Sequence, residues 1–105
     1  MTNVHPIKIE LNDANFLQRL RSALLVQSYQ LTTHAKARMV KRRISTSQVL
    51  QCLGKGKIEE PAHFTVQGDW KATLGYQTGG DYVQVAAAIS KNEKGDLVVI
   101  VTVIL

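Results

Sequence analysis

The spacing of apolar residues changes near Gly56 from the period of a helix to that of a strand. Before Gly56, apolar residues recur at intervals of three and four, as on one face of an α-helix. After it, segments 70–77 and 82–89 alternate in polarity, as half-buried strands do. Helices followed by hairpin-connected strands predict an α+β domain, with two or three N-terminal helices on a small antiparallel meander. A single domain over residues 1–105 fits this length.

Three helices are predicted, each preceded by a residue whose side chain can accept a hydrogen bond from the first turn. They span 13–27 after Asn12 or Asp13, from Thr32 or Thr33 to about Arg43, and from Ser45 to about Leu53. Ser45 and Gln48 have the spacing of a capping box. Leu31 is assigned to the apolar stripe of the second helix, and Gly54 is expected to end the third.

Strands are predicted over 6–11, 57–60 or 62–66, 70–77, 82–89 and 97–105. The last of these is apolar on both faces except at Thr102, so we expect a central strand covered on both sides. The second face of this strand would be covered by the N-terminal helix, by a second copy of the chain in a homodimer, or by an acidic partner.

Basic residues are concentrated in the first half of the chain. Residues 14–58 contain nine Lys and Arg and no Asp or Glu, whereas the rest contains four basic and eight acidic residues. Such a cluster attracts polyanions, most commonly a phosphate backbone. Solvation of helix surfaces is the alternative role for these cations. The absence of acids favours an anionic partner such as RNA. The residues expected to bind it are Lys36, Lys41, Arg43, Lys55 and Lys57.

Several classes of protein do not fit this sequence. The single cysteine, Cys52, cannot form an internal disulfide, which suits a reducing cytoplasm. No apolar run approaches the roughly 20 residues that span a bilayer, and we expect neither a signal peptide nor membrane association. Three dispersed histidines and one cysteine lack metal-ligand spacing, and no glycine-rich loop precedes a helix. We therefore expect no metal and no cofactor.

Residues 31–105 resemble a bacterial family described as domain of unknown function 4258. The matching segments are His34-Ala35, Arg38-Met39, Arg42-Arg43-Ile44, Val49-Leu50, Gly56-Lys57-Ile58, Gly68-Asp69-Trp70-Lys71 and Val101-Thr102-Val103. The family pattern favours glycine at the position of Arg43, and residues 1–30 form a helical extension outside the match. Helices on a compact antiparallel sheet also look like the small ribonuclease toxins of the RelE type and like barnase. This resemblance implies action on RNA and an acidic antitoxin-like partner.

His34, Arg38 and Lys41 are spaced i, i+4 and i+7, so we expect them to share one helix face. Cleavage of RNA without a metal needs a base, a cation beside the phosphate, and an acid. The first helical turn and the nearby Arg38 both disfavour a positive charge on His34, which favours the neutral form that a base requires. Arg38 and Arg42 would hold the phosphate in a two-pronged manner.

The general acid is less clearly indicated than the base. Lys71 and Tyr82 are predicted on the polar side of neighbouring strands, and Thr102 interrupts the apolar last strand. Each has a structural role as its alternative, and a histidine in a first helical turn is often only a polar surface residue. Three functions therefore stay open. They are a small metal-independent ribonuclease-like or toxin-like protein, a non-catalytic nucleic-acid-binding module, and an interaction protein that self-associates through its sheet.

Overall fold

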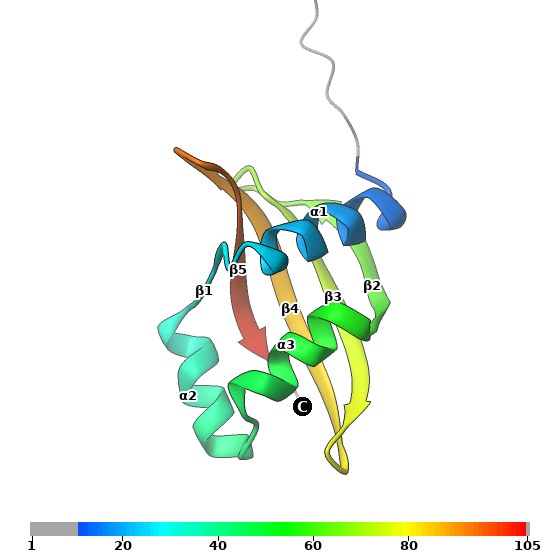
Figure 1. Cartoon of the computed structure of the whole chain (residues 1–105), viewed down its shortest axis with the longest axis vertical. Helices are drawn as coiled ribbons and strands as arrows, with labels where there is room; N and C mark the ends of the chain where they lie inside the picture. The colour runs from blue at the N-terminus through cyan, green and yellow to red at the C-terminus, as the bar shows by residue number, and fades with distance from the viewer. Residues whose placement is uncertain (1–10, 105) are drawn as a thin grey trace, which may run out of the picture.

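The computed structural model describes residues 11–104 and contains three helices and five strands in that range (Figure 1). The elements are α1 (Asp13–Leu25), β1 (Tyr29–Leu31), α2 (Thr33–Arg42), α3 (Thr46–Lys55), β2 (Lys57–Phe64), β3 (Trp70–Thr78), β4 (Asp81–Asn92) and β5 (Gly95–Val103). This arrangement confirms the α+β class and the order of helices before the main strands. The strand predicted over 6–11 lies outside the described residues except for Leu11. Within that described range, no helix is both long and apolar enough to cross a bilayer.

The five strands form one sheet in the order β1-β5-β4-β3-β2. Strands β2 to β5 are joined as the predicted antiparallel meander. The prediction of a purely antiparallel sheet is wrong at one edge, because β1 pairs with β5 in parallel. Leu31 belongs to β1 and not to the stripe of the following helix. The amide of Thr32 donates to the carbonyl of Ile100 at 3.1 Å, which places α2 beside β5.

The hydrophobic core lies between one face of the sheet and helices α1 and α3, which cross the same side of it in Figure 1. Phe16 and Leu20 of α1 are fully buried against this face, so the helix outside the family resemblance is part of the same core. The fully buried residues opposite the helices include Leu74, Val83, Val85, Val98, Ile100 and Val103. The alternation seen in the sequence placed Leu74, Val83 and Val85 on the apolar side of their strands, whereas the last strand, apolar on both faces, showed no such alternation.

The helix ends follow the predicted caps, with one exception. Asn12, Thr32 and Ser45 are the N-caps, and Ser45 forms the capping box with Gln48. Gly54 does not end α3, because the helix continues to Lys55 and Gly56 is its C-cap. A Cβ at Gly56 would overlap two backbone carbonyls. Close packing between α3 and β3 therefore requires glycine at position 56. Gly54 has open space around it and continues the helix.

Strand β5 is central, as predicted, but its two faces differ. Val98 and Ile100 are buried beneath the helices, whereas Leu97 and Val99 on the other face are partly exposed. Of the three alternatives for covering this second face, the N-terminal helix is excluded, since α1 lies on the same side of the sheet as α3. A register shift between Ala86 and Ala87 accommodates an extra residue in β5. Cover by a second copy or by an acidic partner stays a prediction.

Candidate nucleic-acid interface

Six basic side chains on α2, α3 and the adjoining residues project into solvent. They are Lys36, Lys41, Arg42, Arg43, Lys55 and Lys57, and we call them the basic surface. The only ion pair found in residues 11–104 joins Arg19 to Asp96, so none of these six is neutralised there by a carboxylate. Arg43 occupies the left-handed C-cap of α2, with φ of 57°. Five of the six are the predicted RNA-binding residues, and Arg42 was predicted as a phosphate clamp.

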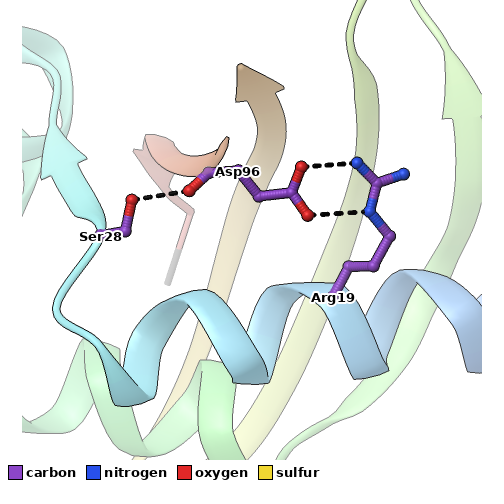
Figure 2. A network of polar contacts seen from close by, with 3 residues as sticks. All are labelled: Arg19, Ser28 and Asp96. Carbon is purple, nitrogen blue, oxygen red and sulfur yellow. Dashed lines mark hydrogen bonds and ion pairs between the residues drawn. The ribbon is translucent and has the colours of Figure 1, made fainter. Parts of the chain in front are cut away.

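The other three cations of the acid-free segment bind groups within the protein. Figure 2 shows Arg19 donating two hydrogen bonds to the carboxylate of Asp96, with N–O distances of 2.9 and 2.6 Å. These bonds lower the pKa of Asp96 and raise that of Arg19. The same part of β5 is held from the other side, because the Ser28 hydroxyl donates to the backbone carbonyl of Asp96.

Arg21 and Arg38 both donate to backbone carbonyls. Arg21 reaches the carbonyls of Leu53 and Gly56 at 3.2 and 2.7 Å, where α3 ends and its last carbonyls lack helical partners. Arg38 donates to Val103 and Ile104 at 3.1 Å each, at the end of β5. These two arginines therefore join separate elements of the fold, and the guanidinium of Arg38 is already bound on one side.

The first turn of α2 lies against β5 near Thr102. Thr32 accepts the amide of Ala35 and donates its hydroxyl to the carbonyl of Val101. Together with Arg38 at Val103, this holds the carbonyls on both sides of Thr102 against α2. His34 is exposed and lies one turn before Arg38. The fold thus places the N-cap residue Thr32 and Arg38 of α2 against the backbone on either side of Thr102, whereas His34 and Arg42 are exposed.

Lys71 and Tyr82 lie on the same sheet face as Thr102 but far from each other. Lys71 is paired with Ala88, six residues along β4 from Tyr82. A rise of about 3.3 Å per residue separates the two by roughly 20 Å. Of the three residues predicted as acids, only Thr102 adjoins α2. The sequence indicated which sheet face these residues share, but not how far apart they lie on it.

The hydroxyl of Tyr82 lies in a separate cluster of polar side chains, which the sequence did not indicate. It lies over Gly75 together with the carboxylate of Glu59, and a Cβ at Gly75 would overlap both. The amide of Gln84 donates to the same carboxylate. A glycine within an otherwise regular strand pattern is the sequence signal that could have indicated a close approach at Gly75.

Cys52 is fully buried in the core. Burial raises the pKa of its thiol to about 12, so the thiolate needed for nucleophilic attack is absent near neutral pH. Within residues 11–104 there is no group of three or more His, Cys, Asp or Glu placed to hold a metal ion. The exposed imidazole of His34 lies in α2, the helix that also carries Lys36, Lys41 and Arg42 of the basic surface.

Comparison with known proteins gives one match. The family model described as "Domain of unknown function (DUF4258)" matches residues 31–105, beginning at the last residue of β1. Neither the curated proteins nor the solved structures that were compared contain a match. The matched segment includes α2, α3 and strands β2 to β5, and it leaves α1 and most of β1 outside.

Proposed function

The chain belongs to the DUF4258 family, and on that premise we propose that it binds the sugar–phosphate backbone of RNA through its basic surface. The observation that supports this proposal is the set of six exposed cations without a carboxylate partner in the described residues. Surface cations normally alternate with acids, which shortens the reach of their field. Here the sequence between residues 14 and 58 supplies no acid, so the positive field extends into solvent.

The number of exposed cations sets an upper limit on the salt dependence of binding. Each phosphate neutralised on a single strand contributes about −0.7 to the slope of log K against log salt concentration. Six contacts would therefore give a slope near −4. Because no base is contacted by these residues in such binding, affinity should depend little on the RNA sequence.

The proposal is tested with a 12-nucleotide single-stranded RNA, whose affinity is measured over a range of salt concentrations. We expect the double variant Arg42→Ala/Arg43→Ala to bind more weakly and to have a slope smaller in magnitude by about 1.4. Lys94→Ala is the matched control, because Lys94 is an exposed cation in the β4–β5 turn, outside the basic surface. Equal affinity and slope for the double variant and the wild type would refute RNA binding by this surface.

Metal-independent cleavage of the bound RNA is the second candidate function, favoured by the exposed His34, which lies in the same helix as the exposed Arg42. The His34 imidazole would take the proton of a ribose 2′-hydroxyl, and the resulting oxygen would attack the adjacent phosphorus. The bond to the 5′-oxygen breaks, and that oxygen leaves with a proton from an acid. Arg42 stabilises the charge on the phosphate. The products are a 2′,3′-cyclic phosphate and a new 5′-hydroxyl.

Cleavage is tested by incubating labelled RNA with the purified protein in the presence of EDTA. We expect His34→Ala to bind RNA as the wild type does and to lose cleavage. Cleavage would support a toxin-like role, in which expression of the wild type, but not of His34→Ala, slows growth. If the wild-type protein binds RNA and produces no cyclic phosphate, the enzymatic proposal fails and RNA binding stands.

A further inference from the structure

An apolar groove of about 580 Å³ lies where α2 ends and α3 begins. Its apolar lining comes from β1, the end of α2 and the connection to α3, and consists of Leu31, Met39, Val40 and Ile44. We call this cavity the α2–α3 groove. Its volume lies in the range of ligand sites, which combine an apolar lining with a few polar groups. In Figure 1 the end of α2 and the start of α3 meet at the lower left, away from α1 at the upper end of the sheet.

The lining of the groove connects the hydrophobic core to solvent. Met39 and Ile44 belong to the core and are only 8% and 7% exposed, whereas Val40 is 80% exposed. A single exposed valine on a helix is ordinary. Here the valine continues an apolar surface that begins in the core, so a ligand with an apolar side chain would bury it together with its neighbours.

The backbone around the groove is held in place by hydrogen bonds. The amide of Ile44 donates to the carbonyl of Met39 at 2.9 Å, and the amide of Arg43 donates to that of Val40 at 3.3 Å. With Arg43 in the left-handed conformation, these bonds form a Schellman motif. The capping box of Ser45 follows directly. The groove is therefore formed before any ligand binds, which lowers the entropic cost of binding.

The charged residues of the groove are all basic. Lys36 and Arg43 line it, both are exposed, and neither has a carboxylate partner within residues 11–104. Thr46 lines it at the start of α3, where the first amides lack intrahelical acceptors and favour a negative charge. The phosphate backbone of RNA matches these cations but not the apolar lining. A peptide that carries both carboxylates and large apolar side chains matches both features.

We infer that the α2–α3 groove binds an acidic amphipathic segment of a partner protein. An apolar side chain of that segment covers Val40, and its carboxylates lie beside Lys36 and Arg43. Because these two cations also belong to the basic surface, the segment and RNA exclude each other. Only this exclusion rests on the proposed function. A partner with such a segment would therefore regulate RNA binding by occupying part of the same surface.

Two labelled peptides of equal charge test the inference by fluorescence anisotropy. The first is a 14-residue peptide of eight Glu and six Leu, in which Leu recurs at intervals of three and four; we call it the Glu–Leu peptide. The second is octaglutamate, which has the same carboxylates and no apolar side chain. We expect the Glu–Leu peptide to bind the wild-type protein at least about tenfold more tightly than octaglutamate. Equal affinity for the two peptides, or binding of neither, would overturn the inference.

Substitution of Val40 removes the apolar contact and leaves every charge in place. We expect Val40→Ser to weaken binding of the Glu–Leu peptide about tenfold and to leave octaglutamate binding unchanged. Val66→Ser is the matched control, because Val66 is a valine that is 99% exposed in the β2–β3 connection, outside the groove. Wild-type affinity of Val40→Ser for the Glu–Leu peptide would contradict docking in the groove.

Substitution of Arg43 by glycine tests the charge of the groove without straining the backbone. Glycine adopts the left-handed conformation freely, so Arg43→Gly removes the cation and keeps the end of α2. We expect both peptides to bind this variant more weakly, with a difference from the wild type that shrinks as salt is added. Lys94→Ala, which removes an exposed cation far along the chain, should bind both peptides as the wild type does. Unchanged affinity in Arg43→Gly would rule out charge complementarity.

Two other occupants of the groove give different results. A second copy of the chain would cause self-association of the wild type in sedimentation, and Val40→Ser would abolish it. RNA in the groove would lose as much affinity in Val40→Ser as the Glu–Leu peptide does. Either result would overturn the inference of an acidic protein partner.

Failure of the proposed function is distinguishable from failure of the groove. If the basic surface does not bind RNA, the Glu–Leu peptide still binds and only the competition is lost. If the groove does not bind acidic segments, the 12-nucleotide RNA binds and an excess of the Glu–Leu peptide does not displace it. When both proposals hold, the peptide displaces RNA from the wild type, and about tenfold more peptide is needed to displace it from Val40→Ser.

Discussion

Replacing Arg38 by alanine is expected to destabilise the fold, although this residue is one of the nine cations of the acid-free segment 14–58. Its guanidinium donates two hydrogen bonds of 3.1 Å to the carbonyls of Val103 and Ile104. A hydrogen bond to a charged group contributes roughly 1.5–3 kcal/mol. The bond to Ile104 is exposed, so water replaces the guanidinium there at small cost. We therefore expect a loss of about 2 kcal/mol, which lowers the Tm of a domain of this size by roughly 8–16 °C.

Arg42→Ala is the matched control for this prediction, because Arg42 is the same residue type one turn further along α2 and is exposed. Its unfolding free energy should stay within about 0.5 kcal/mol of the wild type. Stability is measured by urea and thermal unfolding followed by circular dichroism, and RNA affinity at a temperature where all variants are folded. The reasoning would be refuted if Arg38→Ala kept the wild-type Tm and lost as much RNA affinity as Arg42→Ala.

Three further predictions concern stability and reactivity. Asp96→Asn should cost about 1 kcal/mol near neutral pH. Arg19 lowers the pKa of Asp96 in the folded protein. The difference in unfolding free energy between wild type and variant is therefore fully present above the ordinary carboxyl pKa of about 3.9, and it declines as the pH falls through the lower pKa of the folded state. Urea unfolding at several pH values measures this difference. Cys52, with its thiol pKa raised to about 12, should react with a thiol reagent at pH 8 only after unfolding; rapid reaction of the native protein would contradict its burial. Gly56→Ala should cost more than about 2 kcal/mol in urea unfolding through overlap with two carbonyls, whereas Gly54→Ala, with open space around it, should be neutral or stabilising.

Features that depend on neighbouring residues were predictable from the sequence. The capping box at Ser45 and Gln48 is formed within one helical turn, and so the local pattern was sufficient. Strand β1 is only three residues long, which is too short to show an alternating pattern. Its partner β5 lies about 70 residues further along the chain, so only long-range pairing identifies it as a strand. The end of α3 depends in the same way on Gly56 meeting a carbonyl of β3.

In the candidate site, too, features set by neighbouring residues were predictable and features set by long-range pairing were not. Helical spacing predicted that His34, Arg38 and Lys41 share one helix face, and the fold has all three within α2. Alternation within strands assigned Lys71 and Tyr82 to one face, but their distance depends on the register between β3 and β4. No local pattern encodes this register, because shifting a strand by two residues preserves the face of every side chain. Whether residues from different strands lie close enough to form one site therefore depends on the register between those strands.

The acid-free segment also shows why a count of charges overstates a binding surface. Without carboxylates nearby in the sequence, Arg21 and Arg38 instead bind backbone carbonyls where α3 and β5 end, and Arg19 reaches Asp96 on a distant strand. Planar guanidinium groups are suited to such paired contacts, whereas the ammonium groups of lysine are strongly hydrated and stay in solvent. The nine cations therefore divide into three that hold the fold and six that are exposed, four of them lysines. A measured salt slope steeper than about −4 would require more phosphate contacts than the basic surface provides, and binding would then involve cations outside it.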